Sequence, residues 1–145
     1  MELKKGPHRV YLLTYHMIFV VKYRKPVIDD EIRDYIKERM GTILANNGGS
    51  LIELNSDRDH VHFLFEMPPD VNLSLWIRGT KAAISRKVRE QFPEKLKPYL
   101  WGGELWTDSY FLTTTGGATI EKIRQYIENQ GKPKRKYSKR RKTGE

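Results

Sequence analysis

The sequence predicts an α+β fold whose elements follow the order βαββαβ, the order of a ferredoxin-like (RRM-like) sheet. Aromatic and β-branched runs predict the strands, two amphipathic segments between them predict helices, and residues such as Gly and Pro mark the ends. In a fold with this order, both helices cover one face of the sheet, and the other face is free. A further helix and a basic tail follow the last strand.

The run VYLLTYHMIFVVKYR, residues 10–24, predicts the first strand because it is rich in aromatic and β-branched residues. Pro26 ends it, since proline cannot donate a hydrogen bond within a sheet. The end of this strand is basic, with Lys22, Arg24 and Lys25.

Residues 29–49 predict the first helix. Asp29 or Asp30 can cap its start, and residues 47–49, Asn-Gly-Gly, suit its end. Its apolar stripe consists of Ile32, Ile36, Met40, Ile43 and Leu44.

The runs SLIELNS and HVHFLFE predict the two strands of a hairpin, with a turn at residues 57–59. A second helix follows from about residue 72 to residue 89. One of its faces is apolar and contains Leu73, Ile77, Thr80, Ile84 and Val88. A second stripe contains Arg78, Lys81, Ser85 and Arg89, and its cations fit either a solvated face or contacts to phosphates.

The last strand is predicted near residues 109–115, and a third helix over residues 119–130. Thr119 can cap this helix, and an apolar stripe consists of Ile120, Ile123 and Ile127. Tyr126 and Gln130 are four residues apart and therefore lie on one side of the helix, and Lys122 extends that row by one turn. Gly116 and Gly117 precede the helix, where they suit a tight turn or a hinge.

His60 and His62 lie one residue apart in a run that otherwise looks like a buried strand. Because side chains alternate along a strand, both imidazoles point away from the face of Val61, Phe63 and Phe65. This spacing suits metal chelation, and it also occurs in surface histidines that bind nothing. With the carbonyl oxygen of Gln130 as a third ligand, the site would suit Mg²⁺ or Mn²⁺ on phosphate oxygens better than structural Zn²⁺.

The composition narrows the classes of function. The chain has 145 residues and a formal charge of +9. Because it contains no cysteine, disulfides, thiolate nucleophiles and cysteine zinc sites are excluded. No apolar run approaches the roughly 20 residues that span a bilayer, and we expect a cytoplasmic protein. Residues 131–145 contain five Lys, three Arg and one Glu, a net charge of +7. We therefore predict one domain over residues 1–130 and a flexible basic tail over residues 131–145, which either binds phosphates or only aids solubility.

The motifs DHVHFLFEMPP, LWTDSYF and GGATIEKIRQYIENQ, in this order, resemble the HUH-type single-tyrosine transposases of the insertion-sequence 200/605 family. The resemblance runs from about residue 10 to residue 130 and does not include the basic tail. It implies that His60 and His62 are the metal-binding histidines, Tyr126 is the catalytic nucleophile, and Gln130 is the third metal ligand. The implied cofactor is Mg²⁺ or Mn²⁺.

The resemblance also implies a reaction and partners. Tyr126 would cleave single-stranded DNA at hairpin element ends, form a 5′-phosphotyrosine intermediate and rejoin strands during excision and insertion. The family pattern implies a homodimer in which the tyrosine helix of one subunit completes the histidine pair of the other, with Gly116 and Gly117 as the hinge.

Candidate DNA contacts follow from charge and aromaticity. Tyr23 or Trp76 could stack on bases, although Trp76 fits the core equally well. The basic candidates are Lys22, Arg24, Lys25, Arg78, Lys81 and Lys122. Two alternatives remain open: a catalytically idle nucleic-acid-binding module, and a domesticated relative that processes palindromes in its host's chromosome. A two-histidine phosphodiesterase is set aside, because it needs a second histidine motif and only His8 and His16 remain.

Overall fold

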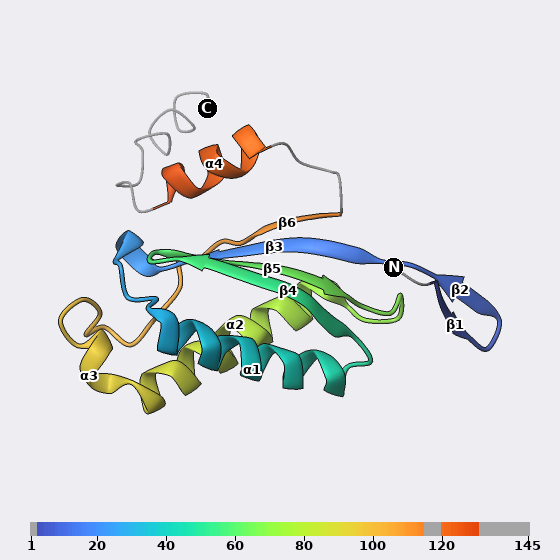
Figure 1. The fold of residues 1–145 in the computed structure, drawn as a ribbon, viewed down its shortest axis with the longest axis horizontal. Helices are drawn as coiled ribbons and strands as arrows, with labels where there is room; N and C mark the ends of the chain where they lie inside the picture. The colour runs from blue at the N-terminus through green and yellow to red at the C-terminus, as the bar shows by residue number, and fades with distance from the viewer. Residues whose placement is uncertain (1–2, 115–119, 131–145) are drawn as a thin grey trace, which may run out of the picture.

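The computed structural model describes residues 3–114 and 120–130. Its main sheet is antiparallel with the strand order β4-β5-β3-β6. Helices α1 and α2 cover one face of this sheet, and α4 lies over the other face (Figure 1). The elements in chain order are β3 (Thr14–Val20), α1 (Asp30–Asn46), β4 (Ser50–Asp57), β5 (His60–Glu66), α2 (Leu73–Gln91), β6 (Phe111–Thr114) and α4 (Ile120–Asn129). The predicted βαββαβ order is confirmed.

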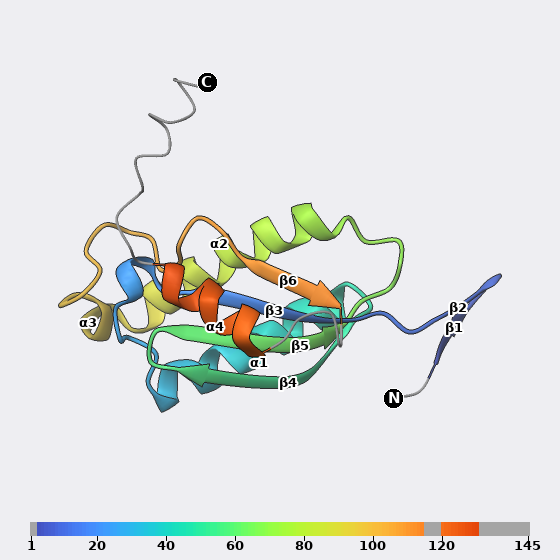
Figure 2. The ribbon, with the colours of Figure 1, turned by 90° about the horizontal axis from the view of Figure 1, so that it is seen from above.

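The predicted first strand over residues 10–24 is too long. Its start belongs to a separate hairpin of β1 (Lys4–Gly6) and β2 (Arg9–Tyr11), which projects from one end of the sheet (Figure 2). Its end leaves the strand and forms a short turn, η1 (Lys22–Arg24), in which Tyr23 and Arg24 have φ angles of 60° and 54°. Left-handed backbone of this kind cannot continue a strand. A short helix, α3 (Pro93–Leu96), was not predicted either.

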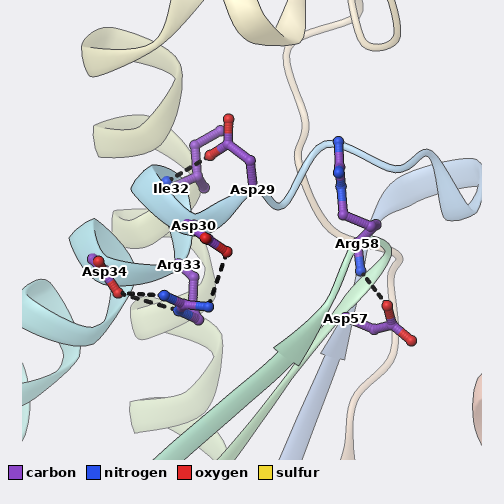
Figure 3. A network of polar contacts seen from close by, with 7 residues as sticks. All are labelled: Asp29, Asp30, Ile32, Arg33, Asp34, Asp57 and Arg58. Carbon is purple, nitrogen blue, oxygen red and sulfur yellow. Dashed lines mark hydrogen bonds and ion pairs between the residues drawn. The ribbon is translucent and has the colours of Figure 1, made fainter.

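Helix α1 begins as the sequence predicts. The side chain of Asp29 accepts a hydrogen bond of 2.8 Å from the backbone N–H of Ile32, which satisfies one of the unpaired donors of the first turn (Figure 3). Arg33 contacts Asp30 and Asp34 at 3.1 Å each, and these exposed ion pairs add little stability (Figure 3). In the adjacent hairpin turn, the backbone N–H of Arg58 donates to the side chain of Asp57 (Figure 3).

The main core lies between the sheet and helices α1 and α2. Val61, Phe63 and Phe65 of β5 are fully buried in it, as their alternation with the histidines predicts. Trp76 is partly buried and packs against Phe65 of the core with ring centroids 5.4 Å apart, so it is not an exposed stacking platform. Most of the predicted helix stripes are buried as well: Ile32, Ile36, Met40 and Leu44 in α1, and Ile77, Thr80, Ile84 and Val88 in α2. Ile43 and Leu73, at the edges of these stripes, are only partly buried.

The opposite face of the sheet presents the side chains of interest. The register pairs Ile18 with His62 and with Phe111, and pairs Val20 with His60, so all five side chains share this face. Ile18 and Val20 are fully buried although they lie outside the main core, because α4 lies over this face (Figure 1). No helix among residues 3–114 and 120–130 is long and apolar enough to cross a membrane.

Candidate active site

His60 lies at the start of β5, on the sheet face that α4 covers. Its Nδ1 atom is 2.9 Å from the Oδ1 atom of Asp59, and the other carboxylate oxygen of Asp59 accepts from Arg24 Nε at 3.1 Å. Burial opposes ionisation of Asp59, but the hydrogen bonds from His60 and Arg24 outweigh it and lower the pKa of the carboxyl group. The carboxylate therefore fixes the orientation of the imidazole and leaves His60 Nε2 without a hydrogen-bond partner in the described chain.

His62 contacts His16, a histidine that lies outside the sequence motifs. His62 Nε2 lies 2.9 Å from the Nδ1 atom of His16, which lies on the neighbouring strand β3, and the two rings are 5.0 Å apart. Burial, together with the nearby His16 and His60, lowers the pKa of His62. The ring is therefore neutral at neutral pH, which is the form that binds metals. The period-2 alternation from His16 to Ile18 and Val20 would have placed His16 on this face.

Tyr126 lies on α4 and Gln130 directly follows the last residue of this helix, and both side chains bind one serine. The Ser109 hydroxyl is 2.9 Å from the Tyr126 hydroxyl and donates to Gln130 Oε1 at 3.3 Å. The Tyr126 ring also packs on Phe111 of β6, with ring centroids 5.4 Å apart. Burial raises the pKa of Tyr126, and the hydrogen bond with Ser109 opposes this only in part. Tyr126 is therefore a neutral phenol at neutral pH, and its attack on a phosphate needs assistance.

Lys81 holds the segment that carries Ser109. This half-buried residue of α2 donates from its ammonium group to the backbone carbonyl oxygens of Thr107 at 2.6 Å and of Ser109 at 3.0 Å. Burial lowers the pKa of Lys81, and the charges of Asp108 and Glu104 oppose that shift. Lys81 thus differs from an ordinary solvated cation, and it supports the tyrosine helix through Ser109.

Helix α4 and the histidine end of β5 border the same cavity. This cavity, of about 560 Å³, has Asp59 and His60 on one side and Arg124, Ile127 and Glu128 of α4 on the other. Among the described residues, no hydrogen bond joins His60 or His62 to Tyr126 or Gln130. The fold thus brings the histidines and the tyrosine helix to one end of one sheet face, in two separate hydrogen-bonded groups.

The donors in this region fit a divalent cation. His60 and His62 supply imidazole nitrogens, Asp59 orients the first of them, and Gln130 supplies an amide oxygen. Within the described ranges, no group of three or more His, Asp or Glu side chains is placed to hold a metal ion. A site of these residues therefore depends on the amide of Gln130 and on ligands from a substrate.

The other predicted site residues fall into three groups. Lys22 and Arg24 make ion pairs, with Glu104 at 2.8 Å and Asp59 at 3.1 Å. Arg78 and Lys122 are exposed, as phosphate contacts would be. The hinge residues Gly116 and Gly117, the cap Thr119 and the whole basic tail lie outside the described residues. His16, Asp59 and Ser109 were not predicted as site residues, although Ser109 lies within the LWTDSYF motif.

Replacing Ser109 by alanine is expected to loosen α4 from the sheet, because the substitution removes both hydrogen bonds between the helix and this hydroxyl. Two such bonds are worth about 1 kcal/mol each, and every 1.4 kcal/mol is about tenfold, so amide hydrogen exchange over residues 120–130 should speed up by about 30-fold. Hydrogen exchange with mass spectrometry measures this. Ser74→Ala, in the exposed first turn of α2, is the matched control. Equal protection of α4 in both variants would show that Ser109 does not hold the helix.

Comparison with known proteins gives consistent results. Residues 9–130 match the family model described as "Transposase IS200 like". The chain is 38% identical over 130 residues to the ISDra2 transposase TnpA of Deinococcus radiodurans, covering 90% of this chain and 92% of that protein. It is 29% identical over 127 residues to the transposase for insertion sequence element IS200 of Salmonella typhimurium, covering 88% and 82% of the two chains.

A solved structure agrees with these sequence matches. The crystal structure of a Deinococcus radiodurans R1 protein assigned as a transposase superposes with a TM-score of 0.78 at 36% identity. The alignment covers 90% of this chain and 99% of that one, so the likeness extends over most of both chains.

Proposed function

This chain belongs to the IS200/IS605 family of transposases, and on that premise we propose that it cleaves and rejoins single-stranded DNA with Tyr126 as nucleophile. One observation carries the proposal. Tyr126 of α4 and Gln130, directly after its end, lie together over the sheet face that carries His60 and His62, and α4 borders the same cavity as His60. Family membership implies DNA strand transfer in general. The proposed specific reaction is nucleophilic attack by Tyr126 on a DNA phosphate.

The proposed reaction exchanges one phosphoester for another. The Tyr126 oxygen attacks a phosphate of the DNA and forms a phosphotyrosine bond to the 5′ end, and the bond from phosphorus to the 3′ oxygen breaks. The phenol loses its proton and the released 3′ oxygen gains one. Because the number of phosphoester bonds is unchanged, no ATP is needed, and another 3′-hydroxyl can reverse the step and join a different strand.

His60, His62 and Gln130 are the proposed ligands of Mg²⁺ or Mn²⁺. When bound, the ion would supply positive charge beside the phosphate and the developing phenolate. The chain's own residues prepare this site. Asp59 orients His60, and burial keeps His62 neutral and ready to bind a cation. Gln130 must release the hydroxyl of Ser109, or accept from it with one lone pair while the other binds the ion.

We also propose a homodimer that recognises DNA hairpins at the element ends, with active sites shared between subunits. In the described structure, Tyr126 binds Ser109 of its own chain. A shared site would therefore require the hydrogen bonds to Ser109 to break before α4 reaches the partner's histidines. The two hydrogen bonds to Ser109 would then hold the tyrosine at rest.

A denaturing gel with labelled single-stranded hairpin DNA from the flanks of this gene tests the proposal. Incubations with Mg²⁺, with Mn²⁺ and with a chelator separate metal-dependent cleavage from binding. We expect a cleaved strand and a slow-migrating covalent adduct only in the metal-containing samples. Binding without cleavage, on DNA that contains the true element ends, would favour the idle nucleic-acid-binding module. A domesticated relative would cleave chromosomal palindromes in preference to its own flanks.

Deleting residues 131–145 is expected to weaken DNA binding and to reduce its dependence on salt, because the tail carries eight of the 27 Lys and Arg residues. The slope of log K against log salt should become shallower by about 0.7 for each phosphate of single-stranded DNA that the tail no longer neutralises. Titrations of a fluorescent oligonucleotide at several salt concentrations measure this slope. An unchanged slope would show that the tail serves solubility alone.

A further inference from the structure

Three exposed aromatic side chains surround one cavity beside η1. The cavity, of about 480 Å³, is lined by Tyr23, Tyr99 and Trp101. Trp101 is 83% exposed and Tyr23 is 64% exposed, although large aromatic residues are usually mostly buried. The other two tryptophans behave in the ordinary way, since Trp106 is 4% exposed and Trp76 packs on the core. Exposed aromatic residues that gather around one hollow indicate a binding site.

The aromatic cavity also contains cations. Lys22 and Lys25 line it together with the carboxylate of Glu104. Glu104 is paired with Lys22 at 2.8 Å, whereas Lys25 makes no ion pair with any residue that the structure describes. Lys22 also lies over the Tyr23 ring, 5.7 Å from its centroid. Aromatic faces beside an uncompensated lysine match a nucleotide, which presents a flat base and a phosphate.

The backbone that presents Tyr23 is strained and firmly held. Both Tyr23 and Arg24 adopt positive φ, which costs free energy in residues other than glycine. The turn is fastened by the hydrogen bond from Lys22 N–H to Leu105 O at 2.8 Å and by that from Val21 N–H to Asp59 O at 2.9 Å. Strain of this kind persists only where surrounding contacts enforce it, and here it turns Tyr23 toward the cavity instead of the core.

A chain of contacts joins this cavity to the histidine pair. Arg24, next to Tyr23, donates to Asp59, and Asp59 in turn contacts His60. A DNA strand whose phosphate lies at His60 could therefore place a neighbouring nucleotide beside η1. The cavity and the active site lie at the same end of the sheet, since Val20, the last residue of β3, pairs with His60.

We infer that Tyr23, Tyr99 and Trp101 form a stacking site for an unpaired base of single-stranded DNA, with Lys25 on an adjacent phosphate. The inference rests on the proposed function for the identity of the ligand. It adds a base-binding site outside the residues that carry out strand transfer. Such a site would hold the single strand next to the phosphate that Tyr126 attacks, and it would prefer strands with bases over a bare phosphate backbone.

The test compares oligothymidylate of about 15 nucleotides with an abasic oligodeoxyribose phosphate of the same length. Both are titrated in chelator, so that cleavage cannot contribute, and affinity is read from fluorescence anisotropy. The variants are Trp101→Ala, Tyr23→Ala, Trp101→Phe and, as a matched control, Tyr11→Ala in the β1–β2 hairpin. Sedimentation of each variant reports its oligomeric state, and circular dichroism reports its fold.

We expect Trp101→Ala and Tyr23→Ala to bind oligothymidylate about fivefold or more weakly than the unaltered chain, and to bind the abasic strand equally well. Trp101→Phe, which keeps an aromatic face, should retain most of the affinity, and Tyr11→Ala should retain all of it. Intrinsic tryptophan fluorescence of the unaltered chain should be quenched by oligothymidylate, and this quenching should disappear in Trp101→Phe.

Three results would overturn the inference. Equal losses on both oligonucleotides, or no loss on either, would show that the aromatic residues do not stack on bases. A changed oligomeric state in Trp101→Ala with unchanged DNA affinity would assign this surface to a second copy of the chain. Because chelator suppresses cleavage, these results are independent of the strand-transfer proposal. Base-dependent binding in a protein that never forms an adduct would refute that proposal and leave the stacking site intact.

Discussion

Replacing Tyr126 by phenylalanine is expected to abolish DNA cleavage and leave DNA binding intact. The substitution removes only the hydroxyl oxygen that would attack the phosphate, and the ring can still pack on Phe111. Loss of a nucleophile should lower the cleavage rate by at least about 10³-fold, whereas the affinity for single-stranded DNA should stay within about twofold. Single-turnover cleavage and anisotropy titrations measure the two quantities separately.

A neighbouring tyrosine provides the control for this result. Tyr110 lies next to Ser109 and packs against the main core, on the side of the sheet opposite to the histidines. Tyr110→Phe removes the same atom without touching the proposed site, so cleavage should persist. Cleavage by Tyr126→Phe at the original rate would refute Tyr126 as nucleophile. An equal loss in both variants would point to a general effect on the fold.

Replacing either His60 or His62 by alanine is expected to remove metal-dependent cleavage. Each change deletes one imidazole ligand, and the remaining ligand with Gln130 would hold Mg²⁺ or Mn²⁺ too weakly. Cleavage in millimolar metal should fall by about 100-fold or more, and chelator should produce a similar loss in the unaltered chain. Calorimetric titration with Mn²⁺ measures metal affinity directly, alongside the cleavage assay.

Two further variants sharpen this test. Asp59→Ala keeps both histidines and removes only the carboxylate that orients His60, so Mn²⁺ affinity should decrease about 10- to 100-fold. His8→Ala, in the turn of the β1–β2 hairpin, removes an imidazole away from the site and should have no effect. Metal-dependent cleavage that survives in His62→Ala would show that the ion binds elsewhere.

Periodicity and capping chemistry predicted most of this fold correctly. The period-2 alternation around His60 and His62 placed both imidazoles opposite Val61, Phe63 and Phe65, and the buried phenylalanines confirm it. Asp29 and Asn72 cap α1 and α2 because their short polar side chains accept from the first-turn N–H groups. Local rules of this kind act within a few residues, so the sequence alone reveals them.

The errors arose where distant contacts decide the structure. Residues 10–24 have uniform strand propensity, yet they divide into β2, β3 and η1, since Val21 and Lys22 bond to Asp59 and Leu105 far along the chain. Lys81 looked like a surface cation on a helix. In the structure its ammonium group is hydrogen-bonded to the backbone of Thr107 and Ser109, a contact between distant parts of the chain that the sequence pattern does not show.

The candidate site divides in the same way. The resemblance and the spacing of residues predicted His60, His62, Tyr126 and Gln130 as site residues, and their roles stay a prediction. The partners Asp59, His16 and Ser109 were missed because each acts through a contact that depends on side-chain orientation or strand register. The tyrosine helix therefore has a specific anchor, Ser109, that spacing alone could not supply.

The covalent intermediate provides the most direct test of strand transfer by Tyr126. The unaltered chain is incubated with its single-stranded hairpin DNA and Mg²⁺ or Mn²⁺, the DNA is trimmed, and the protein is digested with trypsin for mass spectrometry. Cleavage after Arg124 and after Lys134 yields the peptide of residues 125–134, in which Tyr126 is the only tyrosine. We predict that this peptide alone carries the nucleotide remnant, in samples with metal and not in samples with chelator. A remnant on any other peptide, or cleaved DNA without an adduct, would contradict nucleophilic attack by Tyr126.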